Sequence, residues 1–380
     1  MIVEKLANSL DIEQYLHRLG VDAGGIVILS AKAKSHLVSI KDLHVGAANI
    51  LKQDALSIGA DLAVPRGTVI AKEPKVDVLL IATTSQLKKL AKKELAQPFG
   101  LQSLAKKLAE YVKIEAVKKV EVMGIVNAND DSFFQGSRFV NSDAITKIEE
   151  MIASGASIID IGGVSSAPKT KSVSVAEELA RIRPICDVIK AKELYKKVEF
   201  SIDSYEPEVI EYALSCGFQT VNDIRGLESD EVCRVCAKYG AKVVIMHMQG
   251  RPETMQEKPE YTNVLHEIYT FLQMRVEKAK AFGIEEIYLD VGIGFGKTLE
   301  DNLQLIKHLE HFRALGYPLL VGASRKSMIG MIDNSSVEER LGGTLAIHLE
   351  AVRHGAAVLR VHDVAEHVQA LKVQAHLDAL

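Results

Sequence analysis

From residue 120 to the end of the chain, short apolar runs alternate with longer stretches in which apolar residues recur every three or four positions. The short runs predict eight β-strands, at residues 120–126, 157–161, 198–202, 220–221, 242–246, 286–289, 318–321 and 357–361. The longer stretches predict helices, among them 175–190, 207–216, 264–282, 298–315 and 337–354. The repeating unit is therefore a strand followed by a helix.

Six of the helical stretches end in a turn that contains glycine, in the segments SGAS, SCGFQ, KYGAK, AFGIE, ALGYP and RHGAA. A glycine just past the last helical turn adopts the left-handed conformation and returns the chain to the next strand. Strands that are apolar on both faces predict a parallel sheet covered by helices. Eight such units in about 260 residues predict a closed TIM (β/α)8 barrel, and an open doubly wound sheet is the structural alternative.

The first 113 residues have a different pattern, and we assign them to a separate domain of unknown role. Apolar runs at 25–29, 62–64 and 76–81, with helical patterns at 43–58 and 84–111, predict a small α/β or α+β domain. Its lysine-rich stretch QLKKLAKKELA predicts an amphipathic helix with a solvated charged face. The barrel domain is expected to span 114–380.

Composition excludes several classes of partner. The 380 residues carry 46 Lys and Arg against 50 Asp and Glu, spread along the chain, so no basic region predicts nucleic-acid binding. The first residues include Glu4 and Asn8 where a signal peptide would be apolar, and no apolar run approaches the about 18 residues of a membrane span. We expect a cytoplasmic protein. Cys233 and Cys236 form a CxxC without a second ligand pair, which favours buried apolar side chains over a metal site.

Polar side chains begin at the last residue of each predicted barrel strand, where active sites of such barrels are built. These residues are Asn127, Asp160, Ser165, Ser166, Asp203, Asn222, Asp223, Asp290, Lys297, Arg325, Lys326, Arg360 and His362. A polar side chain that points into the barrel mouth needs a partner or a ligand. We therefore interpret the set as one binding site.

The acidic and amide residues suit a different part of a ligand from the basic ones. Carboxylates and an amide accept paired N–H bonds from a flat, guanidine-like heterocycle, and the candidates are Asp203, Asn222 and Asp290. The donors suit phosphate oxygens or an electron-rich ring, and they are Arg325, Lys326, Arg360 and His362. RVHDVAEHVQAL leads directly from a strand into a helix whose first N–H groups favour an anion. The structural alternative for Arg360 and His362 is a salt bridge to Asp363 or Glu366.

The glycine-rich GIGFGKT is not a Walker loop, because Val291 stands where the first glycine of that motif should be. Its glycines allow the backbone and Phe295 to approach a flat ligand. Met246 is suited to pack against a ring. We interpret the neighbouring His247 as a core or supporting histidine rather than a ligand.

The segments GASIIDIGGVSS, FSIDSYEPEV, VNDIRGL, VVIMHMQG, LDVGIGFGKT, LVGASRKSMIG, ERLGGTLA and LRVHDV, in this order, resemble dihydropteroate synthase. The resemblance covers about 120–368 and excludes the N-terminal domain. It implies a homodimeric barrel that joins 6-hydroxymethyl-7,8-dihydropterin diphosphate to 4-aminobenzoate, releases diphosphate with the help of Mg²⁺, and is blocked by sulfonamides. It also implies that diphosphate leaves before the arylamine attacks.

The resemblance assigns roles to matching residues. It implies that Asp203, Asn222 and Asp290 hold the pterin and that Lys326 lies against the ring. Arg360 and His362 would grip the diphosphate, so the expected catalytic residues are Lys326, Arg360 and His362. Asn127 would contact Mg²⁺ or the diphosphate, and Ser327 would seat aminobenzoate. We also expect substrate contacts from Ser166, Met246 and Phe295.

Two loops depart from the family pattern. The first reads Asn127-Ala128-Asn129-Asp130-Asp131-Ser132-Phe133 where the family has NVTPDSF, and Val291 replaces a proline further on. The second lacks the arginine of ESTRPG; Ser166 keeps a hydroxyl there, and we hypothesise that Lys169 or Lys171 supplies the missing charge. Two alternatives stay open at this point: a pterin-binding methyltransferase domain that acts on a corrinoid protein, and a barrel that binds pterin without turnover.

Overall fold

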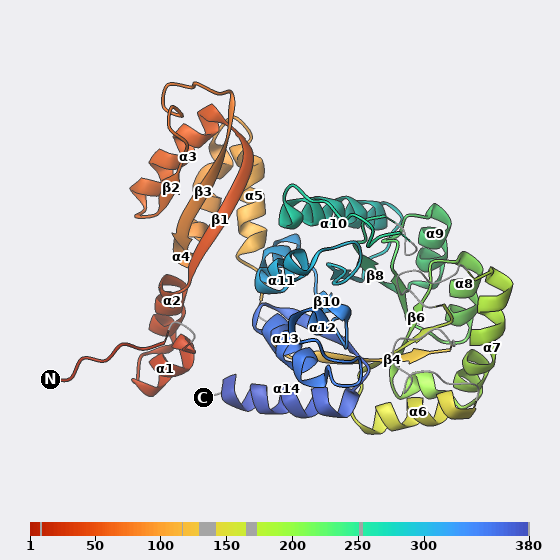
Figure 1. The fold of residues 1–380 in the computed structure, drawn as a ribbon. Helices are drawn as coiled ribbons and strands as arrows, with labels where there is room; N and C mark the ends of the chain where they lie inside the picture. Colours follow the sequence, from red (N-terminus) through yellow and green to blue (C-terminus); the bar gives the residue numbers. More distant parts are fainter. Residues whose placement is uncertain (8–9, 116, 129–141, 165–172, 251–253, 379–380) are drawn as a thin grey trace. The chain divides into compact units, whose positions relative to one another are not determined.

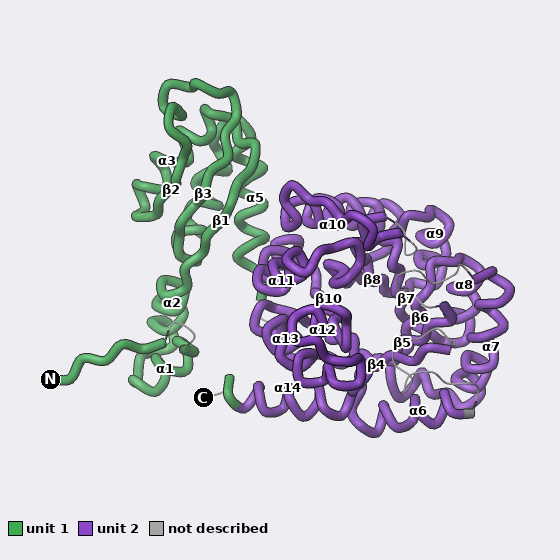
Figure 2. The backbone as a smooth tube through the Cα atoms, viewed as in Figure 1, with its two compact units in different colours: residues 1–115, 377–380 green, residues 116–376 purple. Residues whose placement is uncertain are grey.

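The chain consists of two compact units, residues 1–115 with 377–380, and residues 116–376 (Figure 2). The structure is a computed structural model, and it describes all residues except 8–9, 116, 129–141, 165–172, 251–253 and 379–380. The boundary predicted from the sequence, between 113 and 114, lies two residues before the observed division at 115.

The first unit is an α+β domain with a three-stranded antiparallel sheet in the order β1-β3-β2 (Figure 1). Strand β3 alternates exposed and buried residues along its length, so one face of the sheet packs on helices. The strands are β1 (Ser35–His44), β2 (Asp61–Ala63) and β3 (Lys75–Thr83). The helices are α1 (Ile12–Arg18), α2 (Ala23–Ala33), α3 (Val45–Ser57), α4 (Thr84–Lys93), the short η1 (Glu94–Ala96) and α5 (Leu101–Tyr111).

Three expectations for this unit were wrong. The apolar run 25–29 lies in helix α2, where the Asp22 side chain accepts a hydrogen bond from the Gly25 N–H at 2.8 Å and starts the helix. Strand β1 was missed because its half-buried residues gave no continuous apolar run. The predicted helix 84–111 is interrupted at Pro98, so it forms the two helices α4 and α5.

The second unit is a closed barrel of eight strands in the order β10-β11-β4-β5-β6-β7-β8-β9, and every neighbouring pair is parallel. This confirms the predicted TIM barrel and excludes the open sheet. The strands are β4 (Glu121–Asn127), β5 (Ile158–Gly162), β6 (Glu199–Asp203), β7 (Thr220–Asp223), β8 (Lys242–Met246), β9 (Ile287–Asp290), β10 (Leu319–Val321) and β11 (Ala356–Val361). All eight predicted runs form these strands, with ends displaced by at most two residues.

Helices surround the barrel (Figure 1). They are α6 (Ser142–Ala153), α7 (Val175–Ala191), α8 (Pro207–Ser215), α9 (Asp230–Tyr239), α10 (Val264–Ala281), α11 (Leu299–Lys307), α12 (Ser327–Asp333), α13 (Leu341–Arg353) and α14 (Val364–Asp378), with the short turns η3 (Leu194–Lys196) and η4 (Leu309–Leu315). The predicted helix 298–315 is thus α11 followed by η4. All six glycines at the predicted helix-to-strand corners have positive φ, as expected: Gly155, Gly217, Gly240, Gly283, Gly316 and Gly355.

Two apolar layers hold the barrel. A small cluster fills its interior, with Met123, Ile158, Val244, Leu320 and Val358, and a large cluster packs the outer faces of the strands against the helices. Cys233 and Cys236 are fully buried in the outer cluster, and burial raises the pKa of the Cys236 thiol to about 12. Both cysteines therefore act as apolar core residues.

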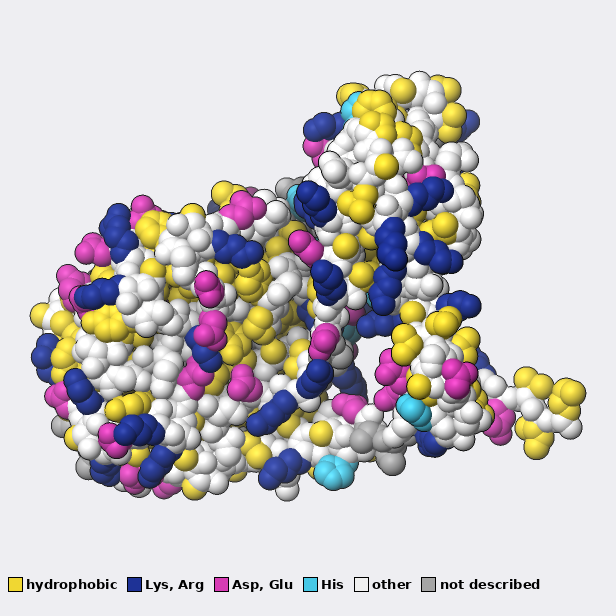
Figure 3. All heavy atoms as spheres, turned by 180° about the vertical axis from the view of Figure 1, so that it is seen from behind, with side chains coloured by type: hydrophobic (Ala, Val, Ile, Leu, Met, Phe, Trp, Pro, Cys, Tyr) yellow, Lys and Arg dark blue, Asp and Glu magenta, His cyan; other side chains and the backbone are white. Residues whose placement is uncertain are grey.

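Charged side chains of both signs are interspersed over the barrel face in Figure 3. In the first unit, Leu87, Leu90 and Ala91 of α4 are buried while its lysines lie toward solvent, which agrees with the amphipathic helix predicted from QLKKLAKKELA. None of the described helices is long and apolar enough to cross a bilayer.

Candidate active site

The strand register aligns several of the predicted site residues around the barrel mouth. Asn127 at the end of β4 pairs with Gly162, Gly162 pairs with Asp203, and Asp203 pairs with Asn222. Across the barrel, Met246 at the end of β8 pairs with Asp290. The side chains of Asn127 and Asp203 lie on either side of Gly162, because a Cβ added to this glycine would lie 3.7 Å from the Asn127 Oδ1 and 3.4 Å from the Asp203 Cβ. The residues thus form a row at the C-terminal ends of the strands.

Arg360 lies in β11, near the C-terminal end of the chain, and its side chain contacts two carboxylates, one on β5 and one on β6. Its Nε donates to the Asp160 Oδ2 at 2.6 Å, and its Nη2 donates to the Asp203 Oδ2 at 2.6 Å. Asp160 also accepts from the Asn222 Nδ2 at 3.1 Å. The side chain of Asp160 is fully buried, and only 18% of the Arg360 side chain is exposed. One guanidinium therefore joins residues from β5, β6 and β11, and through Asp160 also β7.

The ion pair shifts the pKa values of Asp203 and Arg360 in opposite directions. Burial raises the pKa of Asp203 to about 7, while the Arg360 guanidinium pulls it down. The pKa of Arg360 is raised further above its ordinary value, because Asp160 and Asp203 outweigh the effect of burial. Arg360 therefore stays positively charged at any ordinary pH. Asp203 is held in its charged form only by a nearby cation or hydrogen-bond donor.

Arg360 does not form the alternative salt bridge to Asp363 or Glu366 that the sequence left open. Its ion pairs within the described part of the chain go to Asp160 and Asp203. Asp363 instead pairs with Arg325.

A second cluster lies around Asp290 and the glycine-rich loop after β9. The Asp290 Oδ1 accepts the Gly292 N–H at 2.7 Å, and burial raises the pKa of Asp290 while Lys326 lowers it. The Lys326 Nζ lies 4.4 Å from the centre of the Phe295 ring and donates to the Ile293 carbonyl. Burial lowers the pKa of Lys326 to about 8, opposed by Asp290. Charges of Arg360 and Asp203 also act on Lys326, so the two clusters belong to one mouth.

The glycines of this loop are required by close backbone contacts. Gly292 has a φ of +69°, and a Cβ there would lie 1.9 Å from the His247 carbonyl oxygen. Beneath the loop, the buried Lys297 Nζ donates to the His247 and Phe295 carbonyls at 3.3 and 2.9 Å and lies 3.1 Å from the His247 Nδ1. This matches the interpretation of His247 as a supporting histidine, and burial lowers its pKa to about 2.

His362 lies at the start of the turn between β11 and α14. Its backbone N–H and its Nδ1 lie 3.2 and 2.9 Å from the Ser324 Oγ. The Ser324 Oγ accepts the backbone N–H, and the direction of its hydrogen bond with Nδ1 depends on the tautomer of the ring. Burial and then Arg360 lower the pKa of His362 to about 3. The ring of His362 is therefore neutral in this arrangement.

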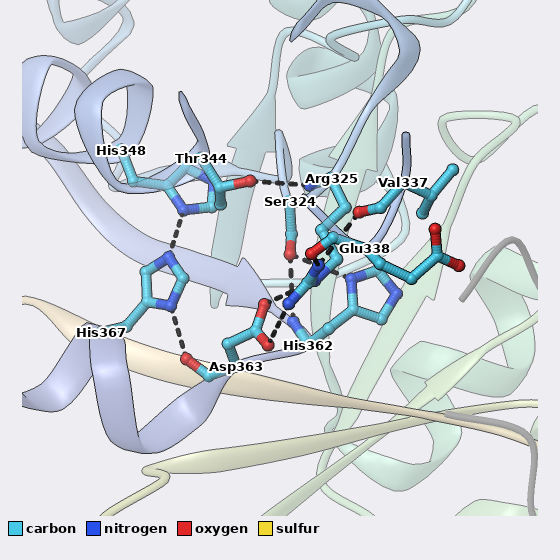
Figure 4. A network of polar contacts seen from close by, with 9 residues as sticks. All are labelled: Ser324, Arg325, Val337, Glu338, Thr344, His348, His362, Asp363 and His367. Atoms are coloured by element: carbon cyan, nitrogen blue, oxygen red, sulfur yellow. Dashed lines mark hydrogen bonds and ion pairs between the residues drawn. The ribbon is translucent and has the colours of Figure 1, made fainter. Parts of the chain in front are cut away.

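Arg325 does not lie among the anion-binding donors, which corrects its grouping in the sequence. Its Nε and Nη2 each donate to Asp363 at 2.8 Å, and its Nη1 donates to the carbonyls of Val337 and Glu338 at 3.0 and 2.7 Å (Figure 4). Only 7% of its side chain is exposed. Arg325 therefore stabilises the loop after β10 from within.

The remaining predicted residues divide into three groups. Asn127 and Met246 lie at strand ends of the mouth, and Met246 is 2% exposed. Ser327 is exposed at the start of α12. Ser165, Ser166, Lys169 and Lys171 lie outside the described residues, as does loop one from Asn129 to Phe133.

Sequence reasoning gave too little weight to Asp160, Lys297 and Ser324. Asp160 and Lys297 had been noted only as polar residues after strands two and six, and Ser324 was passed over between Ala323 and Arg325. A polar residue inside a continuous apolar strand, as at Asp160 in IIDIG, was the available signal. Asp223 was noted as well, but it accepts the N–H groups of Arg225 and Leu227 and shapes its own turn.

Comparison with known proteins gives a consistent result. A family model described as "Pterin binding enzyme" matches residues 123–362. The bifunctional dihydropteroate synthase/dihydropteroate reductase of Helicobacter pylori is 39% identical over 373 residues, 98% of each chain. The dihydropteroate synthase of Escherichia coli is 43% identical over 256 residues, 66% of this chain and 89% of the relative. A solved dihydropteroate synthase of Yersinia pestis, in complex with a sulfonamide drug, has a TM-score of 0.66 at 37% identity, covering 70% of this chain and 97% of that one.

The Arg325 contacts generate a prediction on stability. Arg325→Met removes the donors to the buried carboxylate of Asp363 and to two backbone carbonyls. The free energy of unfolding should therefore fall by about 3–5 kcal/mol. Urea denaturation measures this. Arg353→Met is the matched control, because Arg353 forms an exposed pair with Glu350 and its loss should leave stability unchanged. If Arg325→Met kept wild-type stability and instead weakened substrate binding, Arg325 would be an anion ligand after all.

Proposed function

This chain belongs to the pterin-binding enzyme family and catalyses the dihydropteroate synthase reaction, and we propose that the mouth of its barrel carries out that reaction with the residues described above. The reaction joins 6-hydroxymethyl-7,8-dihydropterin diphosphate to 4-aminobenzoate and yields 7,8-dihydropteroate and diphosphate, a step of folate biosynthesis. The observation that carries the assignment of the site is the convergence of Asp203, Asn222, Asp290, Lys326 and Arg360 on one mouth.

The chemistry sets clear demands on this site. The bond between the pterin methylene carbon and the diphosphate oxygen breaks with its electron pair on oxygen. The arylamine nitrogen forms the new bond to that carbon and loses a proton. The enzyme therefore has to hold the ring in place, accept negative charge on the departing diphosphate, and exclude water from the electrophilic carbon.

The acidic part of the mouth suits the pterin. Its 2-amino group and ring N–H present paired donors, and the acceptors within reach are the carboxylates of Asp203 and Asp290 and the amide of Asn222. Met246 offers a polarisable side chain beside Asp290, and Phe295 offers a flat ring beside Lys326. A ligand N–H that donates to Asp203 favours its charged form, since burial now holds the pKa of that group near 7.

The basic part suits the diphosphate. Arg360 uses Nε and Nη2 for the two acids, while its Nη1 makes no hydrogen bond to a described residue. His362 joins Arg360 in this part, as the resemblance implies, and the first N–H groups of α14 follow two residues later. Ser166, with Lys169 or Lys171, would complete this part in place of the missing arginine of loop two. A Lys169→Ala, Lys171→Ala double variant with unchanged diphosphate affinity would refute that last role.

The residues of the mouth fit a magnesium ion that is held mainly by substrate. Asn127 places an amide oxygen at the rim, and the described residues contain no cluster of three ionisable ligands. Mg²⁺ is commonly bound by one or two protein oxygens together with substrate phosphates. We propose that Asn127 and the diphosphate hold it, and that it would neutralise charge on the leaving group.

We further propose that the protein is a homodimer that acts on small molecules, as the resemblance implies, and that it is cytoplasmic and binds neither nucleic acid nor membranes, as its composition indicates. Light scattering of the purified chain at about twice the monomer mass would support the dimer, and a monomer mass under assay conditions would contradict it.

A direct assay tests the synthase and separates it from both alternatives. Pterin diphosphate and 4-aminobenzoate are incubated with the full chain, and diphosphate and dihydropteroate are measured. We expect diphosphate release that depends on the arylamine, and Asp290→Asn should reduce kcat/KM at least about 100-fold because the ring loses a charged acceptor. Pterin binding without diphosphate release would indicate a binder, and methyl transfer from methyltetrahydrofolate would indicate the methyltransferase.

The pH profile tests the role of Lys326. Its pKa is lowered to about 8, so the ammonium is present below that pH and is lost as the pH rises through it. We expect kcat/KM for pterin diphosphate to fall above about pH 8, because this constant reports groups of the free enzyme. Lys326→Arg keeps its charge, so its profile should stay flat through this range at a lower plateau. An unchanged alkaline limb in Lys326→Arg would assign the limb to another group.

A second candidate function concerns the first unit. The Helicobacter relative matches 98% of this chain and is named a reductase as well as a synthase, whereas the Escherichia relative matches 256 residues, about the length of the barrel unit, and is named only a synthase. We propose that residues 1–115 contribute a dihydropteroate reductase. A dihydronicotinamide or dihydroflavin would supply a hydride to C6 of the imine bond, and a proton would add at N5, giving tetrahydropteroate.

This second function is tested by incubating the full chain with 7,8-dihydropteroate and reduced nicotinamide or flavin. A product heavier by two hydrogens, detected by mass spectrometry, would support the reductase. The barrel variant Asp290→Asn serves as the control, since it should lose the synthase activity and keep the reductase activity. Absence of reduction with either class of donor would reject the proposal without affecting the synthase.

A further inference from the structure

Two histidines that contact no residue assigned to substrate lie beside the mouth. His348 comes from α13 and His367 from α14, and they are 0% and 1% exposed. Their rings lie 2.8 Å apart between the His348 Nδ1 and the His367 Nε2 (Figure 4). Such burial of two polar rings demands that every ring nitrogen has a partner.

The hydrogen bonds fix the proton positions along the pair. A backbone N–H can only donate, so the Ala323 N–H at 3.1 Å requires an unprotonated Nε2 on His348. The proton of His348 then lies on Nδ1 and is donated to the His367 Nε2. This leaves the proton of His367 on Nδ1, which lies 2.5 Å from the backbone carbonyl oxygen of Asp363 and donates to it. All four ring nitrogens are thereby satisfied in one arrangement.

Both rings have to be neutral for this arrangement to exist. A proton on the His348 Nε2 would face the Ala323 N–H, and a proton on the His367 Nε2 would face the His348 Nδ1–H. Burial lowers the pKa of both histidines, and the charged groups around them are mixed. His348 has His367, Lys326 and His362 near it, while His367 has Asp363, Glu366 and Arg325.

The pair connects the two segments that carry the basic part of the site. At one end, Ala323 opens the loop after β10, which continues through Ser324 to Lys326. At the other end, Asp363 directly follows His362 and holds Arg325 of the same loop through a buried ion pair. Ser324 closes the connection with its contact to His362. A shift of either histidine would therefore move Lys326 relative to His362.

We propose that His348 and His367 are positioning residues for the synthase reaction, and that the neutral pair fixes the spacing between the loop that carries Lys326 and the turn that carries His362. This inference rests on the proposed roles of those two residues. Fully satisfied buried networks favour one arrangement over others, and small displacements of positioned groups cost rate more than affinity.

Substitution of His367 tests the proposal in the full chain. His367→Leu removes the acceptor of the His348 proton, whereas His367→Gln offers both an acceptor and a donor. We expect His367→Leu to lower kcat by about 10- to 100-fold with each KM changed less than about threefold, and His367→Gln to recover most of this loss. His376→Leu is the matched control, because His376 of the same helix makes the same contact to a carbonyl four residues back, at 2.8 Å, but is exposed. It should behave as wild type.

Two outcomes would overturn the proposal. One is a His367→Leu protein whose kcat per folded molecule is normal, with a lowered unfolding midpoint as its only defect. The other comes from ¹⁵N NMR of labelled histidines, which reads tautomers without any assay. We expect His348 as the Nδ1–H form, unchanged from about pH 8 to 6, and an Nε2–H or charged ring would contradict the network. If the wild-type chain had no synthase activity, the proposed function would be wrong. The NMR spectrum would still show whether the His348–His367 hydrogen-bond network exists.

Discussion

The buried guanidinium of Arg360 between Asp160 and Asp203 is the interaction on which the site depends. Asp160 in the middle of β5 and Asp203 at the end of β6 are both buried, and the two carboxylates would repel each other and would be costly to desolvate without a cation. Arg360 removes that cost and at the same time holds the positive charge in the centre of the mouth. In the proposed binding mode, a pterin N–H that donates to Asp203 would release the Arg360 Nη2 for a phosphate oxygen. Recognition of the ring and of the leaving group would then be coupled through the Arg360 side chain.

The rest of the barrel keeps that side chain and its neighbours in register. The acceptors lie on strand ends, which the closed sheet holds rigidly. The glycine-rich loop packs on His247 and Gln249 through backbone contacts that only glycine allows, and it places the Phe295 ring 4.4 Å from the Lys326 Nζ. The basic segments are less regular, and a set of buried polar contacts holds them: Arg325 with Asp363, Ser324 with His362, and the histidine pair beneath. The acids are thus fixed by the sheet and the donors by side-chain networks.

The barrel and its acceptors could be predicted from the sequence because both follow from local rules. Apolar runs, helical periods and corner glycines determine the repeating unit, and polar residues at strand ends are visible as breaks in apolar runs. What could not be predicted is which partner each side chain takes. Arg325 and Arg360 look alike in sequence, yet one stabilises a loop and the other the mouth. The histidine pair joins residues nineteen positions apart on two helices, and no periodic pattern in the sequence predicts such a contact. In the first unit, the run at 25–29 fits a helix or a strand equally well until its cap is known.

A crystal structure of the chain with a non-hydrolysable analogue of the pterin diphosphate tests the central claim most directly. Ring N–H groups should lie within about 3.2 Å of Asp203 and Asp290, and a phosphate oxygen should lie within the same distance of Arg360, whose Nε stays on Asp160. An analogue bound outside this mouth, or an Arg360 that keeps both acids while the phosphates are held elsewhere, would contradict it.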